Sequence, residues 1–447
     1  MAKNRQQIKL SDHFSYGKLL RFTVPSMIMM VFTSIYGIVD GFFVSNYAGK
    51  TPFAAVNFIM PYLIIIGTPG FMLGSGGNAL VSKIMGEDDK NLANSIFSLL
   101  IYTAIVLGSV IAGISVILMP QIASAMGAEG ELLDNCVIYG RILASVTPLY
   151  ILQMMFQSFF VAAEKPKLGL WVSVASGVTN MVLDYVLVGV LPFGLIGAAV
   201  ASAISQLMGA AIPLFYFARR NTSLLRLGKA KFDGKALLQT TTNGASELMS
   251  NISMPLVSIL YNVQLLDYAG ENGVAAYGTM MYVNMLFLAL FFGFTMGSAP
   301  VVSFHFGAKN HRELRNLKQK GLSIVGIFSV VMLASSFLLA KPLVRLFVGF
   351  DKELYDLTLH GFYIFIISFP LAGYAILLSG FFTALNDGLT SAVISFLRTL
   401  VFQIAAVLLL PLIWGIDGIW LSLVVAEIMA ASLGFMFLFL KQKKYHY

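Results

Sequence analysis

The sequence predicts an all-α integral membrane protein whose twelve transmembrane helices form two six-helix bundles. Three observations lead to this fold class. Of the 447 residues, 58% are hydrophobic and only 11% are charged, whereas soluble proteins carry about 25% charged residues. Long apolar segments follow one another along the whole chain, and the second half of the chain repeats features of the first.

The apolar segments are long enough to cross a lipid bilayer, which requires about 20 residues per helix. We expect helices because backbone hydrogen bonds must be satisfied within each membrane segment. The alternating strands of about 10 residues that build a membrane β-barrel are absent. The expected spans are residues 19–46, 54–83, 95–118, 135–162, 168–191, 195–218, 236–266, 274–304, 321–340, 356–384, 391–411 and 416–440.

Basic residues are distributed unevenly between the two sides of the membrane. The N-terminus, the even-numbered loops and the C-terminus contain 23 of the 29 Lys and Arg residues, and the odd-numbered loops contain only 4. Because basic loops stay on the cytoplasmic side, we expect both termini in the cytoplasm. The same distribution accounts for the net charge of +8 without a nucleic-acid partner.

An internal repeat divides the chain into two halves. Gly76 and Gly86 recur as Gly297 and Gly307, and several other residues match at the same offset of 221. Each half contains six spans, so the two bundles have the same orientation and are related by a pseudo-two-fold axis along the membrane normal. Such duplicated bundles bind substrate between the halves and alternate access to the two sides.

The basic stretch that follows the sixth span is the expected linker between the bundles. We therefore expect an N-terminal bundle at residues 1–225 and a C-terminal bundle at residues 226–447.

Four acidic residues lie inside the expected spans: Asp40, Asp184, Glu247 and Glu427. A charge in the hydrocarbon core costs about 2.5–3.5 kcal/mol on insertion scales, so each is a functional candidate. Asp40 and Asp184 fall in the outer halves of the first and fifth spans, at similar depth. Two neighbouring carboxylates in a low dielectric cannot both stay charged unless a proton or a cation such as Na⁺ is bound.

Two further polar residues fall at the same depth as these acids. Asn180 lies four residues before Asp184, on the same helical face, and Ser202 lies in the sixth span. Asp40, Asn180, Asp184 and Ser202 are therefore the candidate ion-coupling residues. Hydrogen bonding between packed helices is the alternative role for these side chains. No metal site is expected except a possible Na⁺ at Asp40, Asn180 and Asp184, and no cofactor is expected.

Other polar side chains in the spans are candidates for binding substrate. Tyr36 shares a helical face with Asp40, and Gln206 shares one with Ser202. Glu247 lies near the start of the seventh span, where an acid at a helix N-terminus is an equally good explanation. The candidate substrate-binding residues are Tyr36, Gln153, Gln157, Gln206 and Glu247.

Three residues have expected structural roles. Pro25 interrupts the first span and predicts a kink in the helix that carries Asp40. Arg398 and Glu427 lie in the eleventh and twelfth spans and are predicted to form a structural ion pair. Because the repeat places Glu427 opposite Gln206, a cavity-lining role for this acid remains open.

These motifs together resemble the MATE (multidrug and toxic compound extrusion) family, in its bacterial branch of DinF-like and MepA-like proteins. The resemblance covers nearly the whole chain. It rests on Pro25, Tyr36-x3-Asp40, Gly86-Glu87-Asp88, Asn180-x3-Asp184, the turn Phe193-Gly194-x2-Gly197-Ala198-Ala199, Pro300 and Gly307-Ala308-Lys309-Asn310.

The resemblance implies an exporter of organic cations and other amphipathic compounds in exchange for H⁺ or Na⁺. It implies that Asp40 takes up the coupling ion, that Asn180 and Asp184 belong to the same polar network, and that Tyr36 lies in the cavity. It also implies that Pro25 is linked to bending of the first helix. Another MATE branch carries an acid where Met254 stands here, so a Na⁺ site in the second half is not expected.

We therefore expect a multidrug antiporter that acts as a monomer in the bacterial cytoplasmic membrane. The sequence favours H⁺ over Na⁺ as the coupling ion. Two alternatives remain. A flippase for a lipid-linked or amphipathic metabolite would share the two-bundle design, but its cavity should be more basic. A membrane enzyme would need a nucleophile and base, or a metal set, at one depth, and the histidines lie in loops or at span ends.

Overall fold

The computed structural model describes residues 7–191, 193–349 and 351–447, and these residues form helices and connecting turns without a β-strand. Lys3 and Arg5, which contribute to the basic N-terminus, lie outside the described residues. The elements of the first half are α1 (Tyr16–Phe43), the π-helix η1 (Val44–Ala48), α2 (Lys50–Gly86), α3 (Lys90–Ala125), α4 (Gly130–Ser145), α5 (Thr147–Ala162), α6 (Pro166–Asp184), the π-helix η2 (Tyr185–Val190) and α7 (Gly194–Ala218).

The second half repeats this arrangement with more interruptions. Its elements are α8 (Gly234–Asn243), α9 (Ala245–Gly307), α10 (His311–Val348), α11 (Lys352–Phe365), α12 (Ser368–Ala384), α13 (Gly388–Phe396), the π-helix η3 (Leu397–Val401), α14 (Phe402–Leu409), α15 (Pro411–Trp414), α16 (Ile416–Leu440) and α17 (Gln442–Tyr445).

The described helices account for the twelve predicted spans. Nine helices are long and apolar enough to cross a membrane, and two bent pairs, α4 with α5 and α11 with α12, bring the number to eleven. The 63-residue helix α9 changes direction at Gly270, where φ is 60°, so that it contains two spans. The prediction of an all-α membrane protein with twelve helices is confirmed.

The backbone follows the internal repeat. Three pairs of residues with positive φ occur at equivalent turns of the two halves, at the offset of 221 that relates the matching sequence motifs. The pairs are Gly49 with Gly270, Asp88 with Lys309, and Gly194 with Gly415. The chain therefore turns at the same places in each half, which gives both bundles the same topology.

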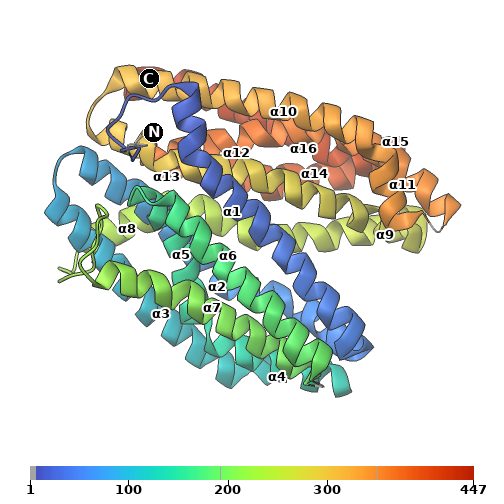
Figure 1. Cartoon of the computed structure of the whole chain (residues 1–447). Coiled ribbons are helices and arrows are strands. Elements are labelled where there is room, and N and C mark those ends of the chain that lie inside the picture. Colours follow the sequence, from blue (N-terminus) through green and yellow to red (C-terminus); the bar gives the residue numbers. More distant parts are fainter. Residues whose placement is uncertain (1–6, 192, 350) are drawn as a thin grey trace, which may run out of the picture.

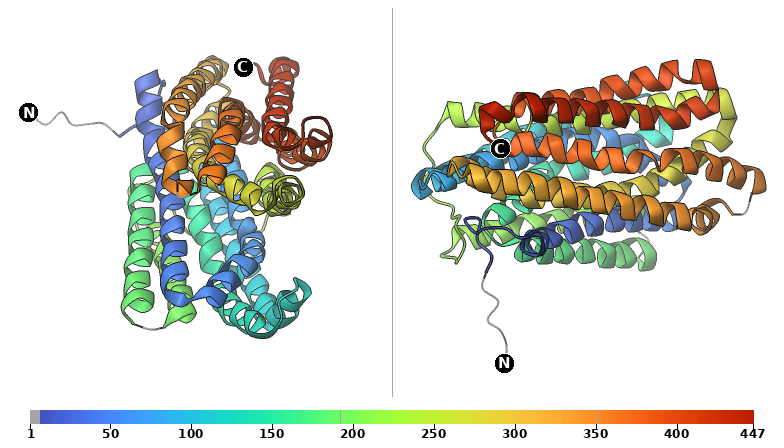
Figure 2. Two further views of the ribbon diagram at one scale, coloured as in Figure 1. Left: turned by 90° about the vertical axis from the view of Figure 1, so that its right-hand side faces the viewer. Right: turned by 90° about the horizontal axis from the view of Figure 1, so that it is seen from above.

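The two bundles lie side by side (Figure 1). We call α1–α7 the N-lobe and α8–α17 the C-lobe. The boundary expected at residues 225 and 226 falls in the connection between α7 and α8. Figure 2 shows that the long helices of both lobes run in roughly the same direction. Helices α1 and α2 of the N-lobe pack against α9 of the C-lobe and form the main interface.

One end of this assembly, which we call the basic end, contains the connections 87–89, 163–165, 219–233, 308–310 and 385–387. Near this end, backbone atoms of one lobe are in contact with backbone atoms of the other. A Cβ atom added to Gly86 would collide with the Phe304 carbonyl oxygen, and one added to Gly307 would collide with the Lys83 carbonyl oxygen. Lys83 and Phe304 are repeat equivalents, so the two contacts form one symmetric closure.

A segment before α1 also joins the lobes at the basic end. We call residues 7–15 the N-terminal strap. The backbone nitrogen of Leu10 donates to Glu164 Oε1 of the N-lobe at 2.6 Å. His13 Nδ1 lies 2.6 Å from Glu313 Oε2 of the C-lobe, and the Phe14 nitrogen donates to Glu313 Oε1 at 2.9 Å. The strap therefore crosses from one lobe to the other.

The end of the chain packs onto the C-lobe. Lys441 Nζ donates to Asp387 Oδ2 at 2.7 Å, and Tyr447 is fully buried and donates to the Leu438 carbonyl at 3.0 Å. Burial would raise the pKa of Asp387, but hydrogen bonds from Lys441, Tyr445 and Thr390 outweigh it and hold the pKa below its usual value. The C-terminal residues are thus tied to the turn before α13.

Candidate functional site

Two buried acids lie where regular helix gives way to π-helix. Asp40 lies in the last turn of α1, just before η1, and Asp184 is the last residue of α6, just before η2. Their relative exposures are 9% and 0%. Because π-helical turns inside longer helices are frequent at functional sites, this local geometry distinguishes Asp40 and Asp184 from ordinary helical residues.

The two acids are close neighbours in the N-lobe. The carboxyl groups of Asp40 and Asp184 interact with each other. Tyr139 of α4 interacts electrostatically with both of them. In the described part of the chain, no Lys or Arg forms an ion pair with either acid. Two adjacent carboxyl groups without a basic partner can share a proton or hold a cation between them.

Asn180 and Ser202 extend this polar cluster. Asn180, one helical turn before Asp184, donates from Nδ2 to Ser202 Oγ at 3.4 Å. Oδ1 of Asp40, both carboxyl oxygens of Asp184 and Oδ1 of Asn180 are buried and have no hydrogen-bond partner among the described residues. Buried acceptors are normally satisfied, so four unsatisfied oxygens in one cluster can accept a proton or a small cation. All four predicted coupling residues therefore lie in this cluster.

A cavity of about 230 Å³ lies between the two lobes. It is bordered by α1, α2 and α5 of the N-lobe and by α9, α12, α13 and η3 of the C-lobe. Its apolar wall includes the flexible or aromatic side chains of Met30, Phe71, Met154, Met254, Phe292 and Met296. Methionine side chains adapt to varied ligand shapes, so this wall suits amphipathic compounds of different form.

Glu247 and Arg398 are the charged residues that line this inter-lobe cavity. Glu247 is the third residue of α9 and lies in its first turn. The helix that is long and apolar enough to cross a membrane begins at Ala245, after the short helix α8. Glu247 therefore lies near the start of its span, as the sequence led us to expect, and it also borders the cavity.

Arg398 lies in η3 and pairs with Glu427 of α16. Its Nε atom donates to Oε1 and Oε2 of Glu427 at 3.0 and 2.9 Å, and both side chains are nearly buried. The two residues that were predicted to pair are thus in contact. Sequence reasoning did not place Arg398 on the cavity, because its exposure depends on how η3 rotates the side chain toward the lobe interface.

The remaining substrate-binding candidates lie in different environments. Gln157 borders the inter-lobe cavity. Gln153 donates to Ser176 Oγ at 3.2 Å. Gln206 is half-buried, and its buried Oε1 has no hydrogen-bond partner among the described residues. Tyr36 lies beside Asp40. The structure therefore places Gln157 and Glu247 on the inter-lobe cavity, whereas Tyr36, Gln153 and Gln206 are in the interior of the N-lobe.

Two further residues belong to these sites without having been predicted. Tyr139 lies near both coupling acids. Asn78 lines the inter-lobe cavity and donates to Ser158 Oγ at 2.8 Å. An amide inside an apolar span was the available sequence signal for Asn78. Pro25 lies within α1, which stays helical on both sides of it, so the predicted kink remains a prediction.

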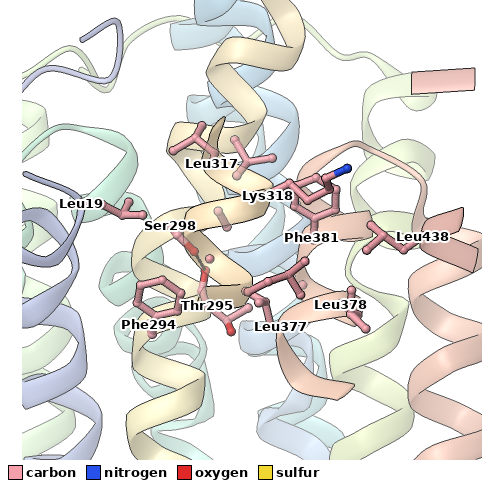
Figure 3. Close-up of a pocket in the computed structure, with 16 residues that line it drawn as sticks. Leu19, Phe294, Thr295, Ser298, Leu317, Lys318, Leu377, Leu378, Phe381 and Leu438 are labelled. Atoms are coloured by element: carbon pink, nitrogen blue, oxygen red, sulfur yellow. Dashed lines mark hydrogen bonds between the residues drawn. The ribbon is translucent and has the colours of Figure 1, made fainter. Parts of the chain in front are cut away.

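A second, smaller cavity lies inside the C-lobe next to α1 (Figure 3). Leu19, Phe294, Leu377 and Leu378 form much of its wall. Figure 3 shows that the ammonium group of Lys318 lies to one side, away from Thr295, and Lys318 Nζ is 5.0 Å from the centre of the Tyr447 ring. This cavity is apolar and offers no acid, so it is less suited to a cationic ligand than the inter-lobe cavity.

Comparison with known proteins agrees with the two-lobed architecture. The MatE family model matches the chain twice, at residues 25–186 and 248–409. The multidrug export protein MepA of Staphylococcus haemolyticus (strain JCSC1435) is 26% identical over 432 residues, which cover 96% of this chain and 95% of that protein.

Solved structures of similar fold cover almost the whole chain. One is described as the outward-facing conformation of a multidrug resistance MATE family transporter of the MOP superfamily. It has a TM-score of 0.93 at 21% identity and covers 99% of both chains. A structure described as MATE in the bent conformation has a TM-score of 0.90 at 21% identity, again over 99% of both chains. At this identity the likeness concerns the fold.

Proposed function

Because the chain belongs to the MATE family of membrane transporters, we propose that it exports amphipathic, mainly cationic compounds in exchange for a proton. The relative named as a multidrug export protein supports this substrate class. The main observation behind the proposal is the pair of Asp40 and Asp184, two buried acids without a basic partner among the described residues. Such a pair can exist in a protonated and a deprotonated form that differ in charge.

The coupling site and the substrate cavity are separate. Asp40 and Asp184 do not line the inter-lobe cavity, whose charged residues are Glu247 and Arg398. In our proposal, a proton enters the acid pair from outside and neutralises it. The end of α1 then moves relative to α6, with Pro25 as the flexible point, and the cavity loses its affinity for the substrate. Asn180 and Ser202 contact each other beside the acids and offer further polar groups to the bound ion.

The membrane orientation follows from charge. We propose that the basic end faces the cytoplasm of a bacterial cell, because cytoplasmic loops are enriched in Lys and Arg. The strap and the glycine contacts hold the lobes together at that end. The described conformation would therefore give access to the cavity from outside. We further propose that the protein works as a monomer in the lipid bilayer and needs no cofactor.

The flippase alternative has less support. It required a markedly basic cavity, whereas the inter-lobe cavity has one acid and one base among its lining residues. An enzyme is not supported either, since the family is one of transporters.

The proposal is tested by efflux of a fluorescent organic cation from proteoliposomes. An imposed pH gradient is expected to drive efflux, and an imposed Na⁺ gradient at equal pH is not. Efflux driven by the Na⁺ gradient alone would assign Na⁺ as the coupling ion. No efflux under either gradient would contradict the proposed antiport.

A further inference from the structure

The inter-lobe cavity offers two opposite charges to a ligand. Glu247 projects from α9 and Arg398 from η3, and Arg398 lies close enough to contribute to the electrostatic environment of Glu247. Among the lining residues these are the ones with a formal charge, so the wall presents one anion and one cation. A purely cationic ligand would find one favourable and one unfavourable partner there.

The hydrogen bonds of Arg398 leave part of its guanidinium group available. Only Nε donates to Glu427, at 3.0 and 2.9 Å. The two terminal nitrogens make no hydrogen bond to the described residues, and the Arg398 side chain is 10% exposed. Because Arg398 lines the inter-lobe cavity, these nitrogens are available to a ligand bound there. Terminal guanidinium nitrogens can bind a carboxylate in a bidentate manner.

The carboxyl group of Glu247 is also available. In the described part of the chain, the hydrogen bonds of Glu247 are made by its backbone: the nitrogen donates to the Gly244 carbonyl at 3.0 Å, and the carbonyl accepts from Asn251 Nδ2 at 2.8 Å. Its side chain is partly exposed toward the cavity. An ammonium group of a ligand could therefore contact Glu247 while the apolar body packs against Met254 and Met296.

We infer that the cavity recognises zwitterionic amphiphiles, with Arg398 binding a ligand carboxylate and Glu247 binding a ligand ammonium group. This inference rests on the proposed export function and narrows its substrate class. The repeat gives it independent support. The positions equivalent to Glu247, Arg398 and Glu427 in the N-lobe are Ser26, Gly177 and Gln206, so this charge set belongs to the C-lobe alone.

A structural ion pair alone does not account for this arrangement. A pair that only joins η3 to α16 has no need to expose guanidinium nitrogens to the lobe interface. Glu427 is 2% exposed and does not line the cavity. It can therefore fix the orientation of Arg398 from behind while the terminal nitrogens stay free, so Glu427 is a positioning residue in our inference.

Binding to the purified protein tests the inference without any ion gradient. The probe is a naphthalene fluorophore with one ammonium arm and one carboxylate arm, and the comparison is its methyl ester, which keeps the cation and removes the anion. Fluorescence polarisation near pH 7 gives a dissociation constant for each. The wild-type protein is expected to bind the zwitterion roughly tenfold to a hundredfold more tightly than the ester, the range for a hydrogen bond between charged groups.

The decisive variant is R398Q combined with E427Q. Replacing Arg398 alone would leave Glu427 buried without a partner and endanger folding, whereas the double variant keeps a neutral, hydrogen-bonding pair. It should bind the ester as the wild type does and lose the preference for the zwitterion. R398K, which keeps the charge but not the planar fork, should retain part of the preference. Glu247→Gln should weaken binding of both probes, because both carry the ammonium group.

Two outcomes would overturn the inference: equal affinity of the wild-type protein for the two probes, or an unchanged preference for the zwitterion in the double variant. The second outcome would leave Arg398 and Glu427 with a structural role only. Failure of the inference is distinguishable from failure of the proposed function. If the ester is bound and exported under a pH gradient but no preference exists, only the inference fails. If neither probe is bound, the proposed substrate class fails with it.

Discussion

Asp40 and Asp184 lie side by side in the N-lobe, each at the point where its helix continues as π-helix, and no Lys or Arg among the described residues pairs with them. Arg398 and Glu427 in the C-lobe form the opposite arrangement, in which an acid and a base neutralise each other. The two lobes share a topology but differ in buried charge. In the proposed mechanism, the N-lobe changes its charge by binding an ion at this acid pair.

Removing the polar neighbours of the acid pair should weaken coupling moderately. The contact between Asn180 Nδ2 and Ser202 Oγ is long, at 3.4 Å, and a typical hydrogen bond contributes about 0.5–1.5 kcal/mol. Ser202→Ala should therefore reduce efflux under a pH gradient by roughly tenfold at most. Efflux is compared at equal protein in proteoliposomes, with Ser45→Ala, an exposed site outside the cluster, as the control. Loss of all efflux in Ser202→Ala would assign a larger role to Ser202.

Replacing a glycine at the lobe interface with alanine should shift the equilibrium between the conformations that open the cavity to the two sides of the membrane. A Cβ at Gly307 collides with the Lys83 backbone across the interface, whereas a Cβ at Gly113 meets nothing within 4 Å. Gly307→Ala should loosen the basic end, so that a cysteine placed in the cavity reacts faster with a reagent added on that side. Gly113→Ala is the matched control. Equal reaction rates in the two variants would contradict the symmetric closure.

The N-terminal strap should help to hold the same end closed. Glu313 is buried and is contacted by His13, by the Phe14 nitrogen and by Asn316 Nδ2 at 2.7 Å. Glu313→Ala removes these contacts together and should increase cysteine labelling of the cavity from the basic end. The control is Glu129→Ala, which changes an exposed acid at the opposite end. If labelling is unchanged in Glu313→Ala, the strap does not contribute to closure.

The pair of Asp387 and Lys441 predicts a pH dependence of stability. Its partners hold the pKa of Asp387 below the unfolded value, despite burial, and that unfolded value is about 3.9. The ionised carboxylate therefore stabilises the fold above this pH, and the contribution is lost as the pH falls through the lower folded-state pKa. Asp387→Asn should cost about 1–2 kcal/mol of unfolding free energy near neutral pH and progressively less as the pH falls below about 3.9.

Thermal unfolding in detergent over this pH range measures the effect. Asp134→Asn, which changes an exposed aspartate, provides the control and should match the wild type throughout. A destabilisation by Asp387→Asn that is independent of pH would show that the carboxylate charge is not what stabilises this turn.

Much of the fold could be predicted from sequence because membrane helices carry their signal locally. The expected sixth span at 195–218 corresponds to α7 (Gly194–Ala218), and the twelfth at 416–440 to α16 (Ile416–Leu440). The repeat was equally visible, since Gly49 and Gly270 adopt positive φ at the offset that relates the two halves. Glycine at a turn with positive φ leaves a direct trace in sequence.

Other features were invisible because they depend on contacts between distant segments. No pattern marks η1, η2 or η3 as π-helical, although Asp40, Asp184 and Arg398 lie in or beside them. The strap joins residues about 300 positions apart, such as His13 and Glu313, and single-sequence reasoning has no access to such pairs.

The most direct test of the account is efflux of a fluorescent cation by Asp40→Asn in proteoliposomes under an imposed pH gradient. Asparagine has nearly the shape of aspartate but cannot bind a proton in this range. The account predicts that the variant binds the substrate and folds as the wild type does, while efflux driven by the pH gradient is abolished. Efflux at the wild-type rate in Asp40→Asn would contradict the central claim that Asp40 takes up the coupling ion.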